Sequence, residues 1–332
     1  MKSVLRAFFV LAVAGVFLFA GSAAFAAPNP EGTKDIKQKP EKVAPPKVSK
    51  DEKKYDWLEI KVGLYWQYDD NVVLLNEDED LVPDYGTDKL VTTVTLRATP
   101  FKKGNWKLGA QYDFYNAAHS DVEYMEIQTH SLLLFGFWSK RPSYLYFPLS
   151  ANMYLLDNTT YLNTVRFSPT FYYEQSNKWL GSVTLSAEVL NYKLASDDMY
   201  DAVDYLVRFS ETYLLKRDTW FKGYVSYNYL KADEQYVSYA GPKVFLGFHT
   251  KLLWEVEGEL SASYHYRDYR LENPTTHVSR VDKRAIFNAV LRRPFGHGIS
   301  AFARYTYVEN NSNETNYDYS RNIITFGIEW RY

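Results

Sequence analysis

The feature that most constrains this chain is a two-residue alternation of apolar and polar side chains, which recurs from Trp57 to the end. In the segment 254–267, one face carries Trp, Val, Gly, Leu, Ala and Tyr, and the other carries Glu, Ser, His and Arg. Successive side chains of a strand point to opposite faces. Burying several carboxylates in an apolar core would be very costly. The pattern therefore predicts strands with lipid on one side and a polar interior on the other.

The number of such segments predicts the size of the sheet. About fourteen can be counted over residues 57–332, which leaves enough chain for membrane strands of about 9–11 residues with their connections. The segments 203–215 and 243–251 alternate poorly, so twelve or sixteen strands are also compatible with the pattern. We predict an all-β fold, a single transmembrane antiparallel up-and-down β-barrel over residues 57–332.

The connections between segments differ at the two ends of the predicted barrel. One set is short and mostly basic, as at Lys102–Asn105 and Ser139–Pro142. The other set is longer and mostly acidic or polar, as at Asn76–Asp88 and Glu309–Asp318. Because outer-membrane barrels have short periplasmic turns and longer outer loops, the basic turns are predicted to face the periplasm.

Tryptophan positions agree with this orientation. Seven of the eight Trp residues fall at the predicted periplasmic end, as expected for an aromatic girdle at a membrane interface: Trp57, Trp106, Trp138, Trp179, Trp220, Trp254 and Trp330. A soluble all-β protein, such as a propeller with one Trp in each blade, is the alternative. That fold explains neither the one-sided Trp positions nor the terminal strand.

The N-terminus is typical of an export signal. Lys2 and Arg6 precede an apolar run at 8–20, and Ala24-Phe25-Ala26 forms a small-x-small site. We expect residues 1–26 to be a signal peptide cleaved after Ala26. Residues 27–56 are rich in Pro and Lys and are predicted to be a disordered periplasmic tail. The chain has no cysteine.

Charged side chains on the polar face of the segments are predicted to line the barrel interior and to set its selectivity. They are Lys61, Arg97, Lys107, Asp113, Arg166, Glu188, Glu255, Glu257, Glu259, His265, Arg304, Glu329 and Arg331. The three Glu residues of 255–259 could bind a cation, but pairing with Arg292 and Arg304 explains them more simply. No cofactor and no metal site are predicted.

Two stretches resemble a known family. They are Tyr68-Asp69-Asp70-Asn71-Val72 in the first segment, and Glu309–Asn313 followed by Tyr317–Asn322 before the last. With about fourteen strands, they resemble the C-terminal β-barrel of surface lipoprotein assembly modifiers and related uncharacterised proteobacterial outer-membrane barrels. The resemblance implies a role in moving a surface lipoprotein client. Members of the family carry a helical repeat domain ahead of the barrel, where this chain has the 27–56 tail.

The last segment resembles the signal read by the barrel-assembly machinery. It places Phe326, Ile328, Trp330 and the terminal Tyr332 on one face. Outer-membrane lipid, lipopolysaccharide and the barrel-assembly machinery are therefore expected partners. The nearly balanced formal charge of −2 gives no indication of nucleic-acid binding.

Two Ser–His pairs are candidate parts of a hydrolase: His130 with Ser131, and His265 with Ser263. Strict alternation predicts that His130 faces inward and Ser131 faces lipid, so these two cannot pair. His265 and Ser263 share a face, but no third group is apparent in the sequence. We expect the chain not to be an enzyme.

Three functions remain compatible with the sequence. The first is a porin-like conduit in the Gram-negative outer membrane, for solute passage or for assisted export of a surface client. The second is a non-conducting structural or adhesion barrel. The third, a hydrolase embedded in the barrel, has the least support.

Overall fold

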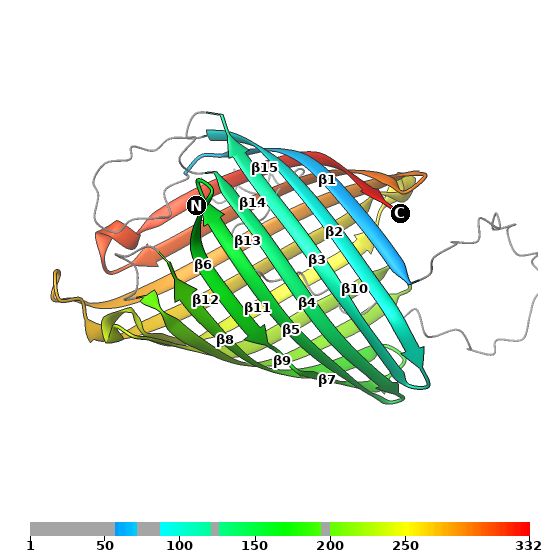
Figure 1. Cartoon of the computed structure of the whole chain (residues 1–332), viewed down its shortest axis with the longest axis horizontal. Helices are drawn as coiled ribbons and strands as arrows, with labels where there is room; N and C mark the ends of the chain where they lie inside the picture. The colour runs from blue at the N-terminus through cyan, green and yellow to red at the C-terminus, as the bar shows by residue number, and fades with distance from the viewer. Residues whose placement is uncertain (1–56, 72–86, 121–125, 194–199) are drawn as a thin grey trace, which may run out of the picture.

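The computed structural model describes residues 57–71, 87–120, 126–193 and 200–332, and these residues form one antiparallel β-sheet (Figure 1). The predicted signal peptide and the 27–56 tail lie outside the described residues. The strands are β1 (Leu58–Asp69), β2 (Thr87–Lys103), β3 (Trp106–His119), β4 (Ile127–Lys140), β5 (Ser143–Leu156), β6 (Thr159–Phe167), β7 (Thr170–Ser176), β8 (Trp179–Tyr192), β9 (Ala202–Lys216), β10 (Thr219–Ala232), β11 (Tyr239–Lys251), β12 (Glu257–Glu272), β13 (Ser279–Gly296), β14 (Ile299–Ser312) and β15 (Tyr319–Arg331).

The sheet closes on itself. Except for β6 and β7, each strand pairs with its neighbours in sequence, and β1 pairs with β15 from Lys61↔Arg331 to Asp69↔Ile323. β6 and β7 together fill one place in the wall, because β5 and β8 pair with both of them on either side of Ser168–Pro169. The fifteen strands therefore occupy fourteen positions. The prediction of an all-β barrel of about fourteen strands is confirmed.

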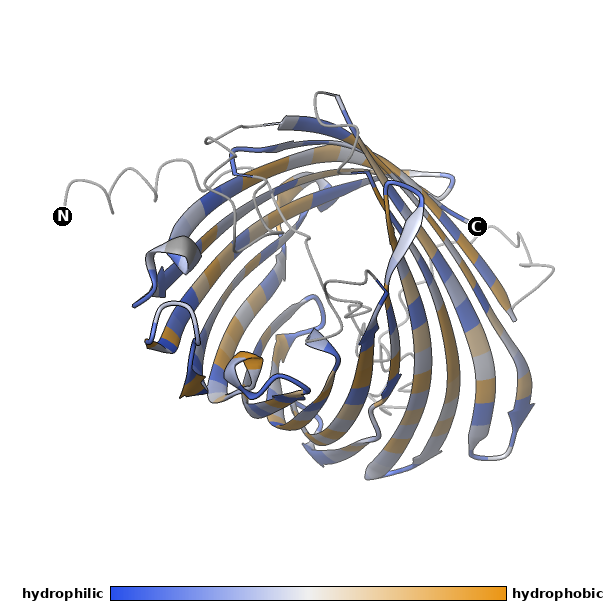
Figure 2. Ribbon diagram, turned by 60° about the vertical axis from the view of Figure 1, so that its left-hand side comes forward, coloured by the Kyte–Doolittle hydropathy of each residue, from blue (hydrophilic) through white to orange (hydrophobic). Residues whose placement is uncertain are grey.

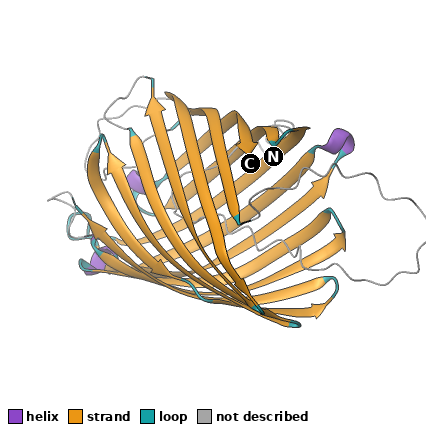
Figure 3. Ribbon diagram, turned by 45° about the vertical axis from the view of Figure 1, so that its right-hand side comes forward, coloured by secondary structure: helices purple, strands orange, loops and turns teal. Residues whose placement is uncertain are grey.

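Short elements complete the described chain. Three 3-10 turns lie in connections: η3 (Gln235–Val237), η4 (Leu253–Glu255) and η5 (Thr315–Tyr317), shown in purple in Figure 3. Within the described ranges, no helix has the length and apolar character needed to cross a membrane.

Strand register shows which residues face inward. The paired residues Lys61, Thr95 and Asp113 share the inner face, while Leu64 and Leu90 point outward and are exposed. The outer face is dominated by apolar side chains that would be unfavourable in water, and Leu246 is 66% exposed. Figure 2 shows the resulting alternation of hydrophobic and hydrophilic residues along each strand. A membrane removes the cost of this exterior.

The connections differ between the two ends of the barrel. At one end the turns are short and include 104–105, 141–142, 177–178, 217–218 and 297–298. Gly104 has a φ of +58°, which glycine adopts without strain. At the other end the connections are longer, with one exception. Asp157 and Asn158 join β5 to β6 directly, and both have positive φ.

Ionic and hydrogen-bonded contacts hold the β1–β15 seam at its long-loop end. Asp69 is fully buried and pairs with Arg321, whose Nε donates to Asp69 Oδ1 over 2.6 Å. Lys89 Nζ lies 3.4 Å from the same carboxylate. Next to it, the backbone N and Nδ2 of Asn322 each donate to Asp70 over 2.6 Å. The two stretches that stood out in the sequence therefore meet at the closure of the barrel.

We expect Asp69→Asn to destabilise the barrel by roughly 3 kcal/mol, because it leaves Arg321 and Lys89 buried without an acidic partner. Urea unfolding of the folded protein in detergent micelles, followed by Trp fluorescence, measures the effect. Glu59→Gln is the matched control at the opposite end of the same strand pair, where Glu59 meets Arg331 at a more exposed site. Its expected cost is below about 1 kcal/mol. Equal effects of the two changes would contradict this role for Asp69.

The orientation of the outer face gives a second prediction. Leu246→Arg places a cation on the outer face in the middle of β11, with an expected cost of about 2–4 kcal/mol in a bilayer. Ser263→Arg is the control, because Ser263 lies next to Leu246's partner Ala262 but faces inward. Unfolding from lipid vesicles should show a much smaller effect for Ser263→Arg. The reverse order would show that the two faces are assigned wrongly.

Candidate functional site in the barrel interior

The charged side chains of the inner face form the candidate site. At the short-turn end, Glu59 accepts a 2.7 Å hydrogen bond from Arg331 Nε and lies 3.3 Å from Lys61 Nζ. Deeper inside, Glu329 lies 2.9 Å from Arg292 Nη2 and accepts a 3.0 Å bond from the hydroxyl of Tyr65. These contacts leave the end of the interior lined by paired charges of both signs.

A second group of polar contacts lies further along the wall. Arg166 Nε donates to Glu188 over 2.8 Å between β6 and β8. Asp113 accepts hydrogen bonds from Thr95 over 2.6 Å and from Gln111 over 2.7 Å. Each of these carboxylates is thus bound to inward donors on its own or a neighbouring strand.

The other predicted interior residues are also placed by register. Arg97 lies over the ring of Phe135 at 4.7 Å, and Arg304 lies over Phe302 at 4.4 Å. Lys107 lies near the short-turn end of β3 and is exposed. Glu257 and Glu259 are partly exposed, and Glu257 is in register with Arg292.

Three predictions about individual residues are wrong. Glu255 lies in η4, outside the strand, where its exposed carboxylate is 3.6 Å from Lys251. Positive φ at Trp254 and Glu255 ends the alternation there, and β12 begins at Glu257. Trp220 faces inward, stacked on His249 at 5.1 Å, because it shares the inner face of β10 with Lys222 and Ser226, while Phe221 points outward. It therefore does not belong to an outward aromatic girdle.

His130 also faces the opposite way from the prediction. It is in register with Phe114 and Met153, and its Nδ1 lies 2.8 Å from the hydroxyl of the exposed Tyr112, whereas Ser131 faces inward opposite Asp113. Leu133 and Phe135 are apolar although they face inward, so both faces of β4 are apolar. The alternation pattern therefore does not show which face of β4 is the inner one, and it assigns His130 to the wrong face. The conclusion that His130 and Ser131 cannot pair is unaffected.

His265 faces inward and is buried. Its Nδ1 accepts a 3.2 Å hydrogen bond from Arg267, and no partner of its Nε2 is present among the described residues. A Ser–His nucleophile needs a carboxylate or amide that orients the histidine, and here a cation occupies that place. The described part of the chain also holds no group of three or more His, Cys, Asp or Glu side chains that could bind a metal ion.

The structure adds inward cations that the sequence analysis missed. Arg208, Lys222, Lys243, Arg267 and Arg284 come from five consecutive strands, β9 to β13. The sequence of β9 contains a pattern that indicates the inward position of Arg208. The apolar residues that alternate with it all point outward: Val203, Tyr205, Val207 and Phe209. Inward Leu206 and Leu214 obscured that alternation.

Inward charge is unevenly distributed around the wall. Between residues 129 and 154, the inward side chains of β4 and β5 are hydroxyl, amide, apolar or aromatic, and none is charged. Leu133, Phe135 and Tyr146 form a buried cluster there, joined by Phe137 and Tyr172. β4 and β5 stand seven positions from β12 and β13 in a wall of fourteen, so they lie on opposite sides of the barrel (Figure 1). On the β9–β13 side, inward cations outnumber the inward carboxylates, which include Glu257, Glu259 and Asp282, whereas the β4–β5 side carries no inward charge between residues 129 and 154.

The outer face carries aromatic side chains at both ends. Trp57, Trp106, Trp179, Trp254 and Trp330 are exposed at the short-turn end, and Trp138 lies opposite Trp106. Phe326, Ile328 and Trp330 of β15, and Tyr332 directly after it, are exposed on the outward side. Their role as an assembly signal remains a prediction.

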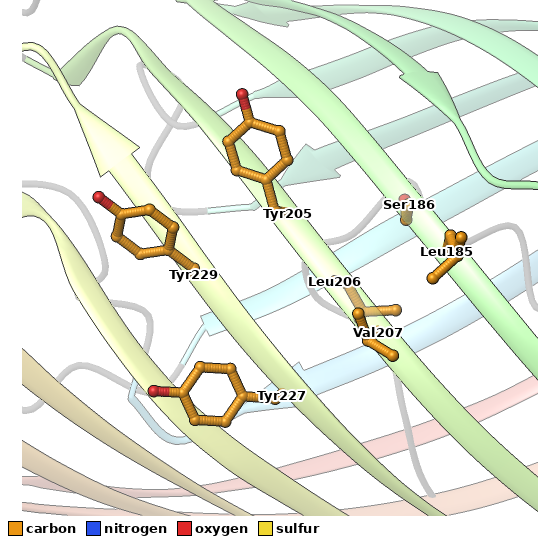
Figure 4. Close-up of a pocket in the computed structure, with 7 residues that line it drawn as sticks. All are labelled: Leu185, Ser186, Tyr205, Leu206, Val207, Tyr227 and Tyr229. Atoms are coloured by element: carbon orange, nitrogen blue, oxygen red, sulfur yellow. The ribbon is translucent and has the colours of Figure 1, made fainter.

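A shallow groove also lies on the outer face. Leu185, Tyr205, Val207, Tyr227 and Tyr229 of β8, β9 and β10 line it, with Ser186 and Leu206 behind them (Figure 4). Tyr205 and Tyr229 stack at 6.3 Å. Because most of its side chains are apolar or aromatic and point outward, the groove belongs to the lipid-facing surface and not to the interior site.

Comparisons with known proteins identify the fold and leave the function open. The model of a family described as "Protein of unknown function (DUF2860)" matches residues 193–331, from the end of β8 into β15. No curated protein matches the sequence. The comparisons do not show the resemblance to surface lipoprotein assembly modifiers, which remains a prediction.

Solved outer-membrane proteins are similar in structure. An anion-selective porin from Comamonas acidovorans is 9% identical, with a TM-score of 0.51, covering 83% of this chain and 98% of that chain. A Pseudomonas aeruginosa FadL homologue is 8% identical, with a TM-score of 0.48, covering 83% and 90%. OccAB4 of Acinetobacter baumannii is 10% identical, with a TM-score of 0.43, covering 84% and 99%. The first of these likenesses shows the fold of an outer-membrane barrel.

Proposed function

We propose that this chain is a porin-like conduit that passes small polar solutes across the Gram-negative outer membrane. The observation that carries the proposal is the two-faced closed wall, with apolar side chains outside and charged side chains inside. An exterior of exposed Leu, Val and Phe is stable in lipid and would promote aggregation in water. The short basic turns and the Trp residues at one end support an orientation with that end toward the periplasm.

Strand number supports passage through the interior. Side chains fill barrels of about eight strands, whereas those of about 16–18 leave an aqueous channel. Fourteen positions lie between these limits, nearer to the channels. Charged inward residues such as Lys61, Arg292 and Arg331 are substantially exposed at the short-turn end. Water in the interior accounts for this exposure without requiring a partner for every charge.

A non-conducting structural barrel is the second candidate, favoured by a specific observation. Several inward side chains toward the long-loop end are almost inaccessible, among them Asp69, Asp282, Arg321 and Ile323. The ionic contacts of Asp69 with Arg321 and Lys89 link β1 to β15 and β2 near the long-loop end. If similar packing extends across the interior, the barrel is closed to solutes and serves as a surface scaffold.

Assisted export of a surface lipoprotein is a more specific version of the conduit, and it rests on the sequence resemblance alone. Deleting the gene while following surface display of a candidate lipoprotein tests it. Retention of that lipoprotein inside the cell would support export, and unchanged display would rule it out for that client. The proposed conduit needs no catalytic residues, and the expectation that the chain is not an enzyme remains a prediction.

Conductance across planar bilayers tests the conduit directly. We expect the refolded protein to give stepwise currents in KCl, and Tyr154→Ala to raise the conductance of each step, because it removes a large inward side chain from the less accessible part of the wall. Tyr205→Ala is the matched control, since Tyr205 faces outward. The proposal fails if correctly folded wild-type protein and Tyr154→Ala carry no current, and the structural barrel is then the better account.

A further inference from the structure

Three of the inward cations lie in one row across the sheet. Register pairs Arg208 with Ser226, Ser226 with Lys243, Lys243 with His265, and His265 with Arg284. The cations therefore recur on alternate strands, about 10 Å apart at their backbones if strands are about 4.8 Å apart. Side chains as long as Arg and Lys can reach one ligand from these positions.

None of these three cations has an acidic partner among the described residues. Salt bridges of the described chain include neither Arg208, Lys243 nor Arg284. The Nε atoms of Arg208 and Arg284 are buried, and the part of the chain that the structure describes offers them no hydrogen-bond acceptor. Buried donors without acceptors are costly, so an acceptor supplied by a ligand would stabilise the row.

Aromatic side chains position two guanidinium groups beside the interior. Arg208 lies over the ring of Tyr224 at 4.5 Å, and Arg267 lies over Tyr239 at 5.2 Å. Arg267 is two residues from His265 on the same face of β12, so it adds a fourth cation beside the row. Stacking on an aromatic ring restrains a guanidinium group, and the N–H groups along its edge can still donate two parallel hydrogen bonds to an oxyanion.

The nearest carboxylates have other partners or lie away from the row. Asp282 accepts a 3.0 Å hydrogen bond from Arg280 Nε and a 3.3 Å hydrogen bond from the Tyr269 hydroxyl. Glu188 pairs with Arg166, and Asp204, in register with it, is four residues along β9 from Arg208. The side of the barrel opposite β12 and β13, formed by β4 and β5, presents no charged inward side chain between 129 and 154.

We infer that Arg208, Lys243 and Arg284, with Arg267 beside them, form a binding site for a multivalent oxyanion, and that the barrel passes anions in preference to cations. This inference rests on the proposed conduit for passage, but the binding site exists whether or not the barrel conducts. The ligand class is a small solute carrying phosphate or clustered carboxylate groups, because several separated cations match several negative charges. The hydroxyl and aromatic side chains of β4 and β5 would face the uncharged part of such a solute.

The test compares the wild type with the triple variant Arg208→Gln, Lys243→Gln, Arg284→Gln. The control variant Lys103→Gln, Lys178→Gln, Arg217→Gln removes the same charge from the short-turn end, outside the row. Calorimetric titration with sodium tripolyphosphate measures binding, with inorganic phosphate as a second probe. The reversal potential in a KCl gradient across a planar bilayer measures selectivity. Circular dichroism and unshifted urea unfolding establish that each variant is folded.

The wild type and the control should bind tripolyphosphate, and the triple variant should bind it at least about tenfold more weakly. The wild type should be anion-selective, and the triple variant should lose that preference. Equal binding by all three proteins, or no binding by the wild type, overturns the site. Cation-selective wild-type current overturns the preference while supporting the conduit. Binding lost only in the triple variant, with no current from any protein, supports the site and rejects the conduit.

Discussion

Closure of the sheet by β1 and β15 is the constraint on which the rest of the structure depends. In lipid, a strand edge with unpaired N–H and C=O groups is prohibitively costly, so a membrane sheet must have no edge. Here the first and last strands meet over nine residue pairs. Backbone bonds between Ile60 and Tyr332 in both directions extend the pairing to the C-terminal residue. The buried Asp69–Arg321 contact secures the other end of this seam.

Closure also determines what each side chain can do. Once the wall is a cylinder, the two-residue period assigns every strand residue either to lipid or to the interior. Residues that face the interior do not contact lipid, so they need not be apolar. Their charged side chains are unevenly distributed around the wall. The cations of β9–β13 and the neutral side chains of β4–β5 are far apart in sequence, and the cylinder places them across from each other.

Much of this architecture could be predicted from the sequence. Alternation, turn composition and Trp positions indicated a barrel, and the strand count was close because each spanning segment needs a similar length of chain. The 3-10 turn at Trp254 and Glu255 was not predictable from the alternation, which continues through these residues in the sequence. Trp220 was assigned to the outer face by residue type, although it shares the inner face of β10 with Lys222. The face of His130 was misjudged because both sides of β4 are apolar. The row of Arg208, Lys243 and Arg284 depends on the register between strands, which no single segment reveals.

The absence of cysteine from the sequence allows a direct measurement of the central claim, that lipid contacts the outer face of this wall and water the inner face. Single cysteines at Leu246 and at Ser263 lie on neighbouring strands and opposite faces. In lipid vesicles, a small water-soluble maleimide should modify the cysteine at 263 rapidly and the one at 246 slowly. A lipid-soluble quencher should affect a fluorophore at 246 and spare one at 263. Equal reactivity, or the reverse order at both sites, would contradict this account.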